Sequence, residues 1–355
     1  MSEYLINLNI PNFKKMRSKE LGRCGLPLMI SSKNFKFSCK KQMHFLVILK
    51  AFLLLTVSAS TLPTELYAQE RHFLPLFDVY HSSNAFAGTS ADKIFLNGIE
   101  IETPSALQPR PDKVVGGGAI WLNALQSDVA SMSFSAAPFF WHQRFLDSGE
   151  QSTVYGASMI FGFSDMPQRH IDLRANLTRL EASWTTETID DISLRLGYLQ
   201  LSNTGAQFNI GVNAGRRWGA AEHPVSRLGI DTRYRTTADS LHVSFEARAT
   251  VRISDAKEFS GHDAGIGLML GRDFESGLSY IRIEREWSHD DSTIAGQPAP
   301  RRQTKNLAEV GYGWELDSLP IGRLTAYARH QRSRSNLALF ESDTTVVGIG
   351  LRLEL

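Results

Sequence analysis

The sequence is poor in cysteine: among 355 residues only Cys24 and Cys39 are cysteines. Two cysteines near the N-terminus exclude a disulfide scaffold and leave no thiol ligand or nucleophile for the rest of the chain. An excess of one charge is also missing, because 38 basic residues stand against 37 acidic ones. That balance excludes a protein that binds nucleic acid or another polyanion through bulk charge.

Long apolar runs are missing as well. The two longest, Phe45–Leu49 and Ala51–Ala59, are separated by Lys50, whereas a spanning helix needs about 20 apolar residues. A polytopic helical membrane protein is therefore excluded. Because Lys40-Lys41 precedes the two runs and Leu66-Tyr67-Ala68 follows them, they are typical of a secretory signal peptide.

We expect this signal peptide to span residues 43–68, with Met43 as the true start and cleavage after Ala68. Residues 1–42 are then a mis-annotated or disordered extension, and residues 69–355 form the mature domain. The alternative is a real cytosolic extension followed by an uncleaved anchor.

Strict alternation of apolar and polar residues dominates the mature domain. From Leu241 to Ile253 every second residue is apolar, and Val347 to Leu355 repeats the pattern. A period of two predicts a β-strand with one apolar and one polar face. The parity slips near Thr178–Leu180, which predicts a β-bulge. Related segments predict strands near residues 73–82, 115–125, 129–141, 152–163, 171–184, 192–202, 207–215, 225–235, 264–270, 278–287, 308–316 and 323–332.

The length of these segments separates two all-β folds. Strands of a soluble sandwich usually span about 3–10 residues, whereas a tilted strand that crosses a bilayer needs about 9–11. Several segments here reach that length, and their polar faces carry glycine and charge. The sequence therefore predicts an all-β fold, a transmembrane antiparallel β-barrel of about 14 strands, with 12 to 16 as the range. A periplasmic sandwich is the alternative.

All six tryptophans fall at or near ends of predicted strands, where an aromatic girdle of a membrane barrel would lie. They are Trp121, Trp141, Trp184, Trp218, Trp287 and Trp314.

Charged residues on the polar faces are the first candidate site. Lining a lumen, they would set charge selectivity or contact a polar client segment. The alternative is that they form cross-strand ion pairs that only stiffen the wall. The candidates are Arg227, Arg233, Arg235, Glu246, Arg248, Arg252, Arg282, Glu284, Glu309, Arg329 and Arg352.

A second candidate is the segment Tyr80-His81-Ser82-Ser83-Asn84. His81 and Ser83 are two residues apart and share one face of a strand, as a histidine that activates a serine requires. A His-x-Ser-Asn run is found in outer-membrane lipid hydrolases, but no third residue of such a site is evident in the sequence.

The two ends of the mature domain carry a family resemblance. Phe77 to Ala85 resembles the first barrel strand of surface lipoprotein assembly modifier proteins, with Ser82 in the place of an aspartate. The run Arg332 to Phe340, which contains Arg334, Ser335 and Asn336, resembles the closing hairpin of that family. The resemblance covers the C-terminal outer-membrane barrel domain only. It implies that Ser83, Asn84, Arg334, Ser335 and Asn336 form hairpin motifs, and that the protein helps proteins or lipoproteins reach the cell surface.

These observations lead to one preferred hypothesis and two alternatives. The first is a Gram-negative outer-membrane barrel, exported through a cleaved signal peptide, that acts as a conduit or assembly aid for a protein or lipoprotein client. The second is a passive, porin-like channel for small polar solutes, and the third is a lipid hydrolase that uses His81 and Ser83. The partners expected are outer-membrane lipid, the barrel assembly machinery and an exported client. No cofactor, metal or nucleic acid is expected.

Overall fold

The computed structural model describes residues 72–353, except 97–98, 123–124, 130–131, 167, 185–187, 220–222 and 317–321. The expected extension at 1–42 and the expected signal peptide at 43–68 lie outside the described residues. Within the described part no helix is long and apolar enough to cross a membrane.

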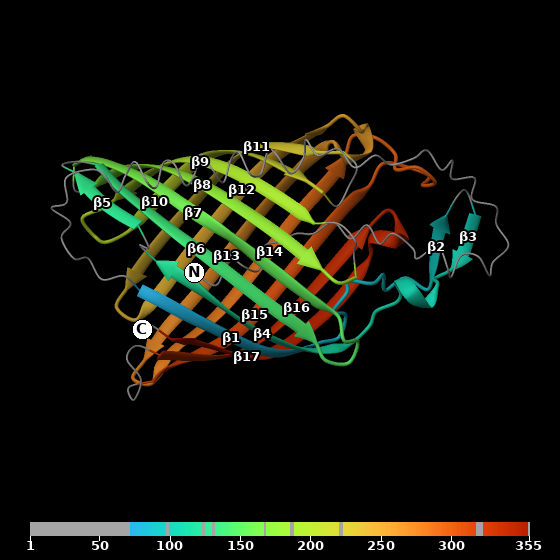
Figure 1. Ribbon diagram of the computed structural model, residues 1–355, viewed down its shortest axis with the longest axis horizontal. Helices are drawn as coiled ribbons and strands as arrows, with labels where there is room; N and C mark the ends of the chain where they lie inside the picture. The colour runs from blue at the N-terminus through green and yellow to red at the C-terminus, as the bar shows by residue number, and fades with distance from the viewer. Residues whose placement is uncertain are drawn as a thin grey trace. The chain divides into compact units, whose positions relative to one another are not determined.

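Extended strands make up about 75% of the described structure, and three short 3-10 turns accompany them (Figure 1). The 3-10 turns are η1 (Ser105–Leu107), η2 (Lys257–Phe259) and η3 (Ala338–Phe340). The strands are β1 (His72–Ser82), β2 (Lys93–Leu96), β3 (Ile99–Glu102), β4 (Asp112–Leu122), β5 (Leu125–Val129), β6 (Met132–Phe145), β7 (Gln151–Met166), β8 (Arg169–Ala182), β9 (Ile189–Leu201), β10 (Gln207–Trp218), β11 (Val225–Ala238), β12 (Leu241–Ser254), β13 (Gly261–Phe274), β14 (Gly277–Asp290), β15 (Arg302–Leu316), β16 (Gly322–Ser335) and β17 (Ser342–Leu353).

The main sheet closes on itself. From β6 to β17 each strand pairs antiparallel with the next, β17 pairs with β1, β1 with β4, and β4 returns to β6. The short strand β5 pairs with the other half of β6, so β4 and β5 occupy one position in the wall. The result is a closed antiparallel barrel of 14 strands, which confirms the predicted fold class.

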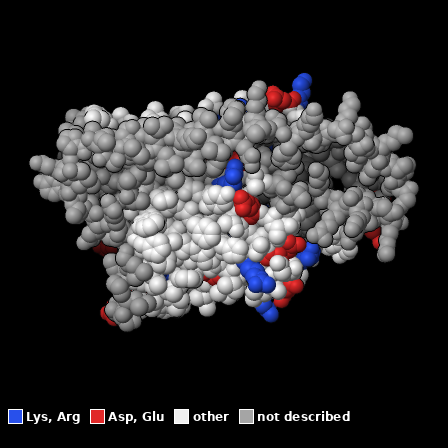
Figure 2. All heavy atoms as spheres, in the orientation of Figure 1, with Lys and Arg blue, Asp and Glu red and all other residues white. Residues whose placement is uncertain are grey.

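The outer face of the wall is apolar. Ile230, Ile283 and Ile349 are each more than half exposed, and most other exposed large apolar side chains share the same alternation. In Figure 2 the described atoms over the middle of the wall are mostly uncharged, and Lys, Arg, Asp and Glu gather toward the end that carries β2 and β3. A closed ladder with an apolar outer surface satisfies the two conditions for spanning lipid with strands. The protein is therefore a transmembrane β-barrel of the outer-membrane class.

The two ends of the barrel differ. At one end, the turn end, only Asp239 and Ser240 separate β11 from β12, and Glu275 and Ser276 separate β13 from β14. At the other end, the loop end, residues 83–111 (with β2 and β3) and 291–301 connect the strands. Since outer-membrane barrels have short periplasmic turns and longer external loops, the loop end faces the outside.

The predicted β-bulge near Thr178–Leu180 was wrong. Register is continuous through Thr178–Leu180 on both sides of β8, and the irregularity lies on β7 between Phe163 and Met166. The parity slip has another cause: Leu180 points inward and packs with Val154 and Ile189.

The tryptophans divide into two groups. Trp121 and Trp314 lie near the turn end, and Trp218 and Trp287 near the loop end, all on the outward-facing side of their strands, as a girdle requires. Trp141 and Trp184 do not belong to a girdle. Trp141 lies inside the wall against Gly116 and Gly118, and Trp184 packs against Phe86 and Phe145. These two tryptophan side chains pack against apolar residues inside the barrel and do not contact the membrane interface.

Large inward side chains lie sideways over glycines of neighbouring strands. A Cβ at Gly311 would lie 2.5 Å from the Tyr280 ring, and one at Gly211 would lie 2.5 Å from the Arg195 guanidinium. At Gly348 it would lie 2.6 Å from Tyr80 Cβ. Each glycine therefore provides the space in which a neighbouring side chain lies flat against the wall rather than pointing to the barrel axis.

Gly348→Ala is expected to destabilise the barrel, because the added Cβ would also come within 2.8 Å of the Tyr327 ring. Overpacking of this kind costs about 1–3 kcal/mol. The matched control is Gly350→Ala, two residues further on the same face, where the nearest atom is 3.6 Å away. We expect the compact form to be lost at a lower temperature for Gly348→Ala alone, measured by heat-modifiable gel migration. Equal behaviour of the two variants would contradict this packing argument.

Candidate functional site

The candidate functional site is the inner wall of the barrel, where charged side chains pair across strands. Arg195 on β9 is one centre: its Nη2 donates to Asp231 Oδ2 on β11 at 2.7 Å, and its Nη1 lies 3.8 Å from Asp172 on β8. Asp191 forms a second centre, since Arg217 Nε and Arg227 Nη2 both donate to it, at 2.8 and 2.6 Å. Two of these pairs, Arg195–Asp231 and Arg227–Asp191, therefore connect β9 to β11 across the strand between them.

The pairing continues around the wall from β11 to β14. Arg233 pairs with Glu246, and Arg248 on β12 pairs with Glu286 on β14. Arg282 Nε donates to Glu284 on the same strand at 2.7 Å. The first two contacts are the cross-strand ion pairs that the alternative interpretation of the sequence described, and the third runs along one strand.

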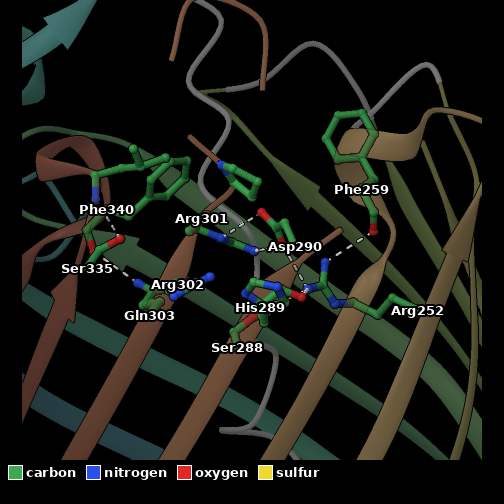
Figure 3. A network of polar contacts seen from close by, with 12 residues as sticks. Arg252, Phe259, Ser288, His289, Asp290, Arg301, Arg302, Gln303, Ser335 and Phe340 are labelled. Atoms are coloured by element: carbon green, nitrogen blue, oxygen red, sulfur yellow. Dashed lines mark hydrogen bonds and ion pairs between the residues drawn. The ribbon is translucent and has the colours of Figure 1, made fainter. Parts of the chain in front are cut away.

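The best-buried charge cluster lies at the loop end (Figure 3). Arg252 Nη2 donates to Asp290 Oδ1 at 2.8 Å, and Arg301 Nη2 donates to the same oxygen at 3.0 Å. The Asp290 carboxylate is only 1% exposed. Arg252 also donates to Asp263 at 2.9 Å and to the Phe259 carbonyl at 3.1 Å. A single carboxylate therefore joins β12, β14 and the loop of residues 291–301.

Tyrosines connect the ion pairs to the strands where the barrel closes. Tyr280 Oη donates to Glu309 at 2.9 Å, and Arg329 Nε donates to the other oxygen of Glu309 at 2.5 Å. On β16, Tyr327 Oη donates to Asp78 of β1 at 2.9 Å. The polar network thus reaches across the contact between the first and last strands.

Every charged lumen residue named from the sequence lies on the inward side of its strand by register. The set is Arg227, Arg233, Arg235, Glu246, Arg248, Arg252, Arg282, Glu284, Glu309, Arg329 and Arg352. Sequence analysis missed several of their partners, among them Asp191, Asp263 and Asp290, and also the pair of Arg195 and Asp172. All five lie on the polar parity of predicted strands or at their ends, and that parity was the signal that could have found them.

One sector of the inner wall is apolar, contrary to the expectation of a uniformly polar face. Val154, Leu180 and Ile189 pack together with Phe139 and Trp141. Beside them Phe86, from the loop of residues 83–111, packs on Val114 and Phe145. This sector lies toward the loop end of β4 to β9, and the paired charges line β8 to β16. The inner wall is therefore amphipathic.

The segment around His81 and Ser83 is placed differently from a catalytic site. His81 is exposed on the outward side of β1, across from Val347. Ser83 Oγ accepts a hydrogen bond from the Thr345 backbone N–H at 2.8 Å. Among the described residues no hydrogen bond joins His81 to Ser83, and the serine oxygen instead joins the end of β1 to β17.

The two asparagines of the predicted hairpin motifs each bind a pair of backbone groups. Asn84 accepts from Gly88 N–H at 2.7 Å and donates to Gly88 C=O at 2.8 Å. Asn336 accepts from Arg302 N–H at 2.6 Å and donates to Pro300 C=O at 2.9 Å. Each asparagine side chain accepts from one backbone N–H and donates to one backbone carbonyl, as a neighbouring strand would. Both asparagines therefore fix the conformation of a loop.

The same two loops contact each other at the loop end. Thr89 Oγ1 donates to the Ala338 carbonyl at 2.6 Å, and Ser90 N–H donates to the Glu341 carbonyl at 3.0 Å. Nearby, Ser335 Oγ accepts from Leu337 N–H at 3.1 Å, and Arg334 lies 3.9 Å from Glu341. The two hairpin motifs predicted from the ends of the sequence therefore lie at one end of the barrel and are connected through their loops.

Among the residues that the structure describes, no three His, Cys, Asp or Glu side chains gather in a way that could hold a metal ion.

Comparison with known proteins gives likeness of architecture only. No protein-family model matches the chain, and no curated protein sequence matches it. Similar solved structures include OpdK of Pseudomonas aeruginosa with vanillate, at 9% identity and a TM-score of 0.40, covering 81% of this chain and 98% of that one. OccK2 (OpdF) of P. aeruginosa has 11% identity and a TM-score of 0.41, covering 80% of this chain and 98% of that one. A loop-deletion mutant of OmpT, an outer membrane protein of Vibrio cholerae, has 9% identity and a TM-score of 0.43, also covering 80% of this chain and 98% of that one. The barrel assignment rests on the strand register of the chain itself.

Asp290→Asn is expected to loosen the loop end, because it removes the buried carboxylate that Arg252 and Arg301 share and leaves Arg252 with Asp263 alone. Breaking a buried pair costs about 3–5 kcal/mol. Glu315→Gln is the control, since its pair with Arg323 is exposed, with 68% of the Glu315 side chain accessible, and such pairs contribute about 0–1 kcal/mol. Urea unfolding in lipid vesicles measures both variants. A loss for Asp290→Asn no larger than that for Glu315→Gln would contradict the assigned role of Asp290.

Proposed function

We propose that the protein is a non-enzymatic channel of the outer membrane through which small polar solutes diffuse. The observation that carries the proposal is the arrangement of the inner wall. Arg195, Tyr280 and Tyr327 lie over glycines of adjacent strands and bind acids on the wall. Large side chains held flat leave the middle of the lumen to water.

The size of the barrel supports this proposal. Barrels of about 8 strands are filled by their own side chains, and those of 16–18 strands leave an aqueous channel. A barrel of 14 strands is closer in strand number to the barrels with an aqueous channel than to the filled ones. Glycine at many inward positions also reduces the volume that side chains occupy.

The wall chemistry suggests the class of solute. Paired arginines and carboxylates on β8 to β16 face an apolar sector that contains Phe139, Val154 and Leu180. Since acids and bases are nearly matched along the wall, we expect weak ion selectivity. Solutes with one polar and one apolar side fit such a lumen best.

Surface export of a protein or lipoprotein client, which the family resemblance implies, remains a hypothesis for this chain. Loss of a specific protein from the cell surface on deletion of the gene, with restoration by the intact gene, would support it over the channel.

Cysteine accessibility tests the channel. In a background with Cys24 and Cys39 replaced by serine, Thr325→Cys puts a thiol on the inward side of β16, and Ala326→Cys puts one on the outward side. We expect an anionic methanethiosulfonate reagent to lower single-channel conductance in planar bilayers for Thr325→Cys. Because Ala326 faces lipid, its variant should not respond.

Two results would overturn the channel. One is the absence of conductance steps from protein whose heat-modifiable migration shows a folded barrel. The other is an equal response of Thr325→Cys and Ala326→Cys to the reagent.

Ser83→Ala tests the enzymatic alternative. Because Ser83 Oγ accepts a backbone hydrogen bond and His81 faces outward, we expect membrane lipid profiles of cells with this variant to match those of the wild type. A change in lysolipid or acyl composition that follows Ser83→Ala and also His81→Ala would establish hydrolysis instead.

A further inference from the structure

Three arginines on the outer wall differ from those inside. Arg285 on β14, Arg302 on β15 and Arg332 on β16 are exposed on the outward side of their strands. Within the described part of the chain, none of the three forms an ion pair, whereas most inward arginines bind a carboxylate. Asp343 lies opposite Arg332 on β17, but it contacts His330 at 3.5 Å. Among the described residues, no acid lies within ion-pair distance of any of the three guanidinium groups, although Asp343 is the register partner of Arg332.

Arg285 and Arg332 lie just above the apolar band, and Arg302 lies four residues nearer the loop end in the register. Arg285 and Arg332 lie on either side of Asn306 in the register, so their backbones are about 10 Å apart. Ile283, two residues below Arg285, is 54% exposed in the apolar band. Arg285 also lies over the Trp287 ring at 5.3 Å, which holds the guanidinium at the height where tryptophan marks the membrane interface.

A hollow in the outer wall adjoins these three arginines. Its volume is about 780 Å³, and Ala249, Ala264 and Trp287 line its lower part. Its upper part is lined by His262, His289 and Arg302, which lie side by side on β13, β14 and β15. The hollow exists because Ala249 and Ala264, paired across β12 and β13, are small. It is apolar toward the membrane centre and polar toward the loop end, where its lining includes Arg302 and also Asp263.

We propose that this surface, defined by Arg285, Arg302, Arg332 and the hollow, binds a phosphorylated glycolipid of the outer leaflet. The acyl chains lie against Ala249, Ala264 and Trp287, and the phosphates are bound by the arginines. Guanidinium groups bind phosphate in a bidentate manner, and unpaired arginines above an apolar surface match a lipid with an anionic head.

The positive charge of this surface favours an anionic lipid over a second copy of the chain. A copy placed by two-fold symmetry on the same face would bring its own arginines against these ones, and like charges in contact are unfavourable. The nearby acids do not offset this, because Asp291, Asp343 and Glu341 lie beside His262, His330 and Arg334.

The test is native mass spectrometry of the folded barrel in detergent with lipid A that carries its phosphates, and with lipid A from which they were removed. The patch variant is Arg285→Gln, Arg302→Gln and Arg332→Gln together. The control variant removes three other exposed outward cations near the loop end, Lys113→Gln, Arg144→Gln and Arg216→Gln. We expect the wild type and the control to retain bound phosphorylated lipid A, and the patch variant to bind it at least tenfold more weakly.

Two outcomes would overturn the proposal. If both triple variants lose binding equally, the lipid is held by the overall charge of the loop end and not by this surface. If the wild type binds lipid A equally with and without phosphates, the arginines do not recognise the head group. Arg302→Gln alone repeats the measurement should the triple variant not reach the folded, heat-modifiable form. Conductance of the patch variant should equal that of the wild type, because these residues face away from the lumen.

Discussion

Closure of the sheet is the constraint on which the rest of this structure depends. In lipid an unpaired backbone amide or carbonyl costs several kcal/mol, so strands can span only as a closed ladder. Here β1 binds both β17 and β4, and β4 binds β6, so the ladder of the described strands runs all the way round the barrel. Once the ladder is closed, each strand has one face toward lipid and one toward the interior, and the period-two pattern decides which residues face which solvent.

The inward side chains are then confined to a narrow space, and the wall accommodates them in a consistent way. Tyr280, Tyr327 and Arg195 extend along the wall to an acid on another strand, and the glycine in between provides the room. The hydrogen bonds offset the desolvation of the charges, and the same contacts hold neighbouring strands in register. A polar interior and a rigid wall therefore arise from one set of residues.

Much of the fold could be predicted from the sequence, because the alternation along β12 and β17 is nearly unbroken. Parity placed residues such as Arg252 and Glu309 on the inner face. The same parity could not identify their partners, since Asp290 binds Arg301 across a loop and Tyr327 binds Asp78 from the other end of the chain. The parity rule failed for Trp141 and Leu180, because it assumes that every apolar residue of a strand faces lipid. Inside the barrel these apolar side chains bury one another, and a period of two does not distinguish that environment from lipid.

The period of two also explains why arginines close together in the sequence face either the lumen or the outer surface of the barrel. In Glu284-Arg285-Glu286 the arginine lies between two acids along the chain, yet both glutamates point inward to Arg282 and Arg248. Arg285 points outward and is left without either of them. Arg301 and Arg302 are adjacent, but Arg301 turns to Asp290 while Arg302 faces outward beside His289. Two charged residues that are adjacent in a strand therefore point to opposite faces of the sheet and cannot pair with each other. An outward arginine at this height is thus kept apart from the acids that adjoin it in the sequence.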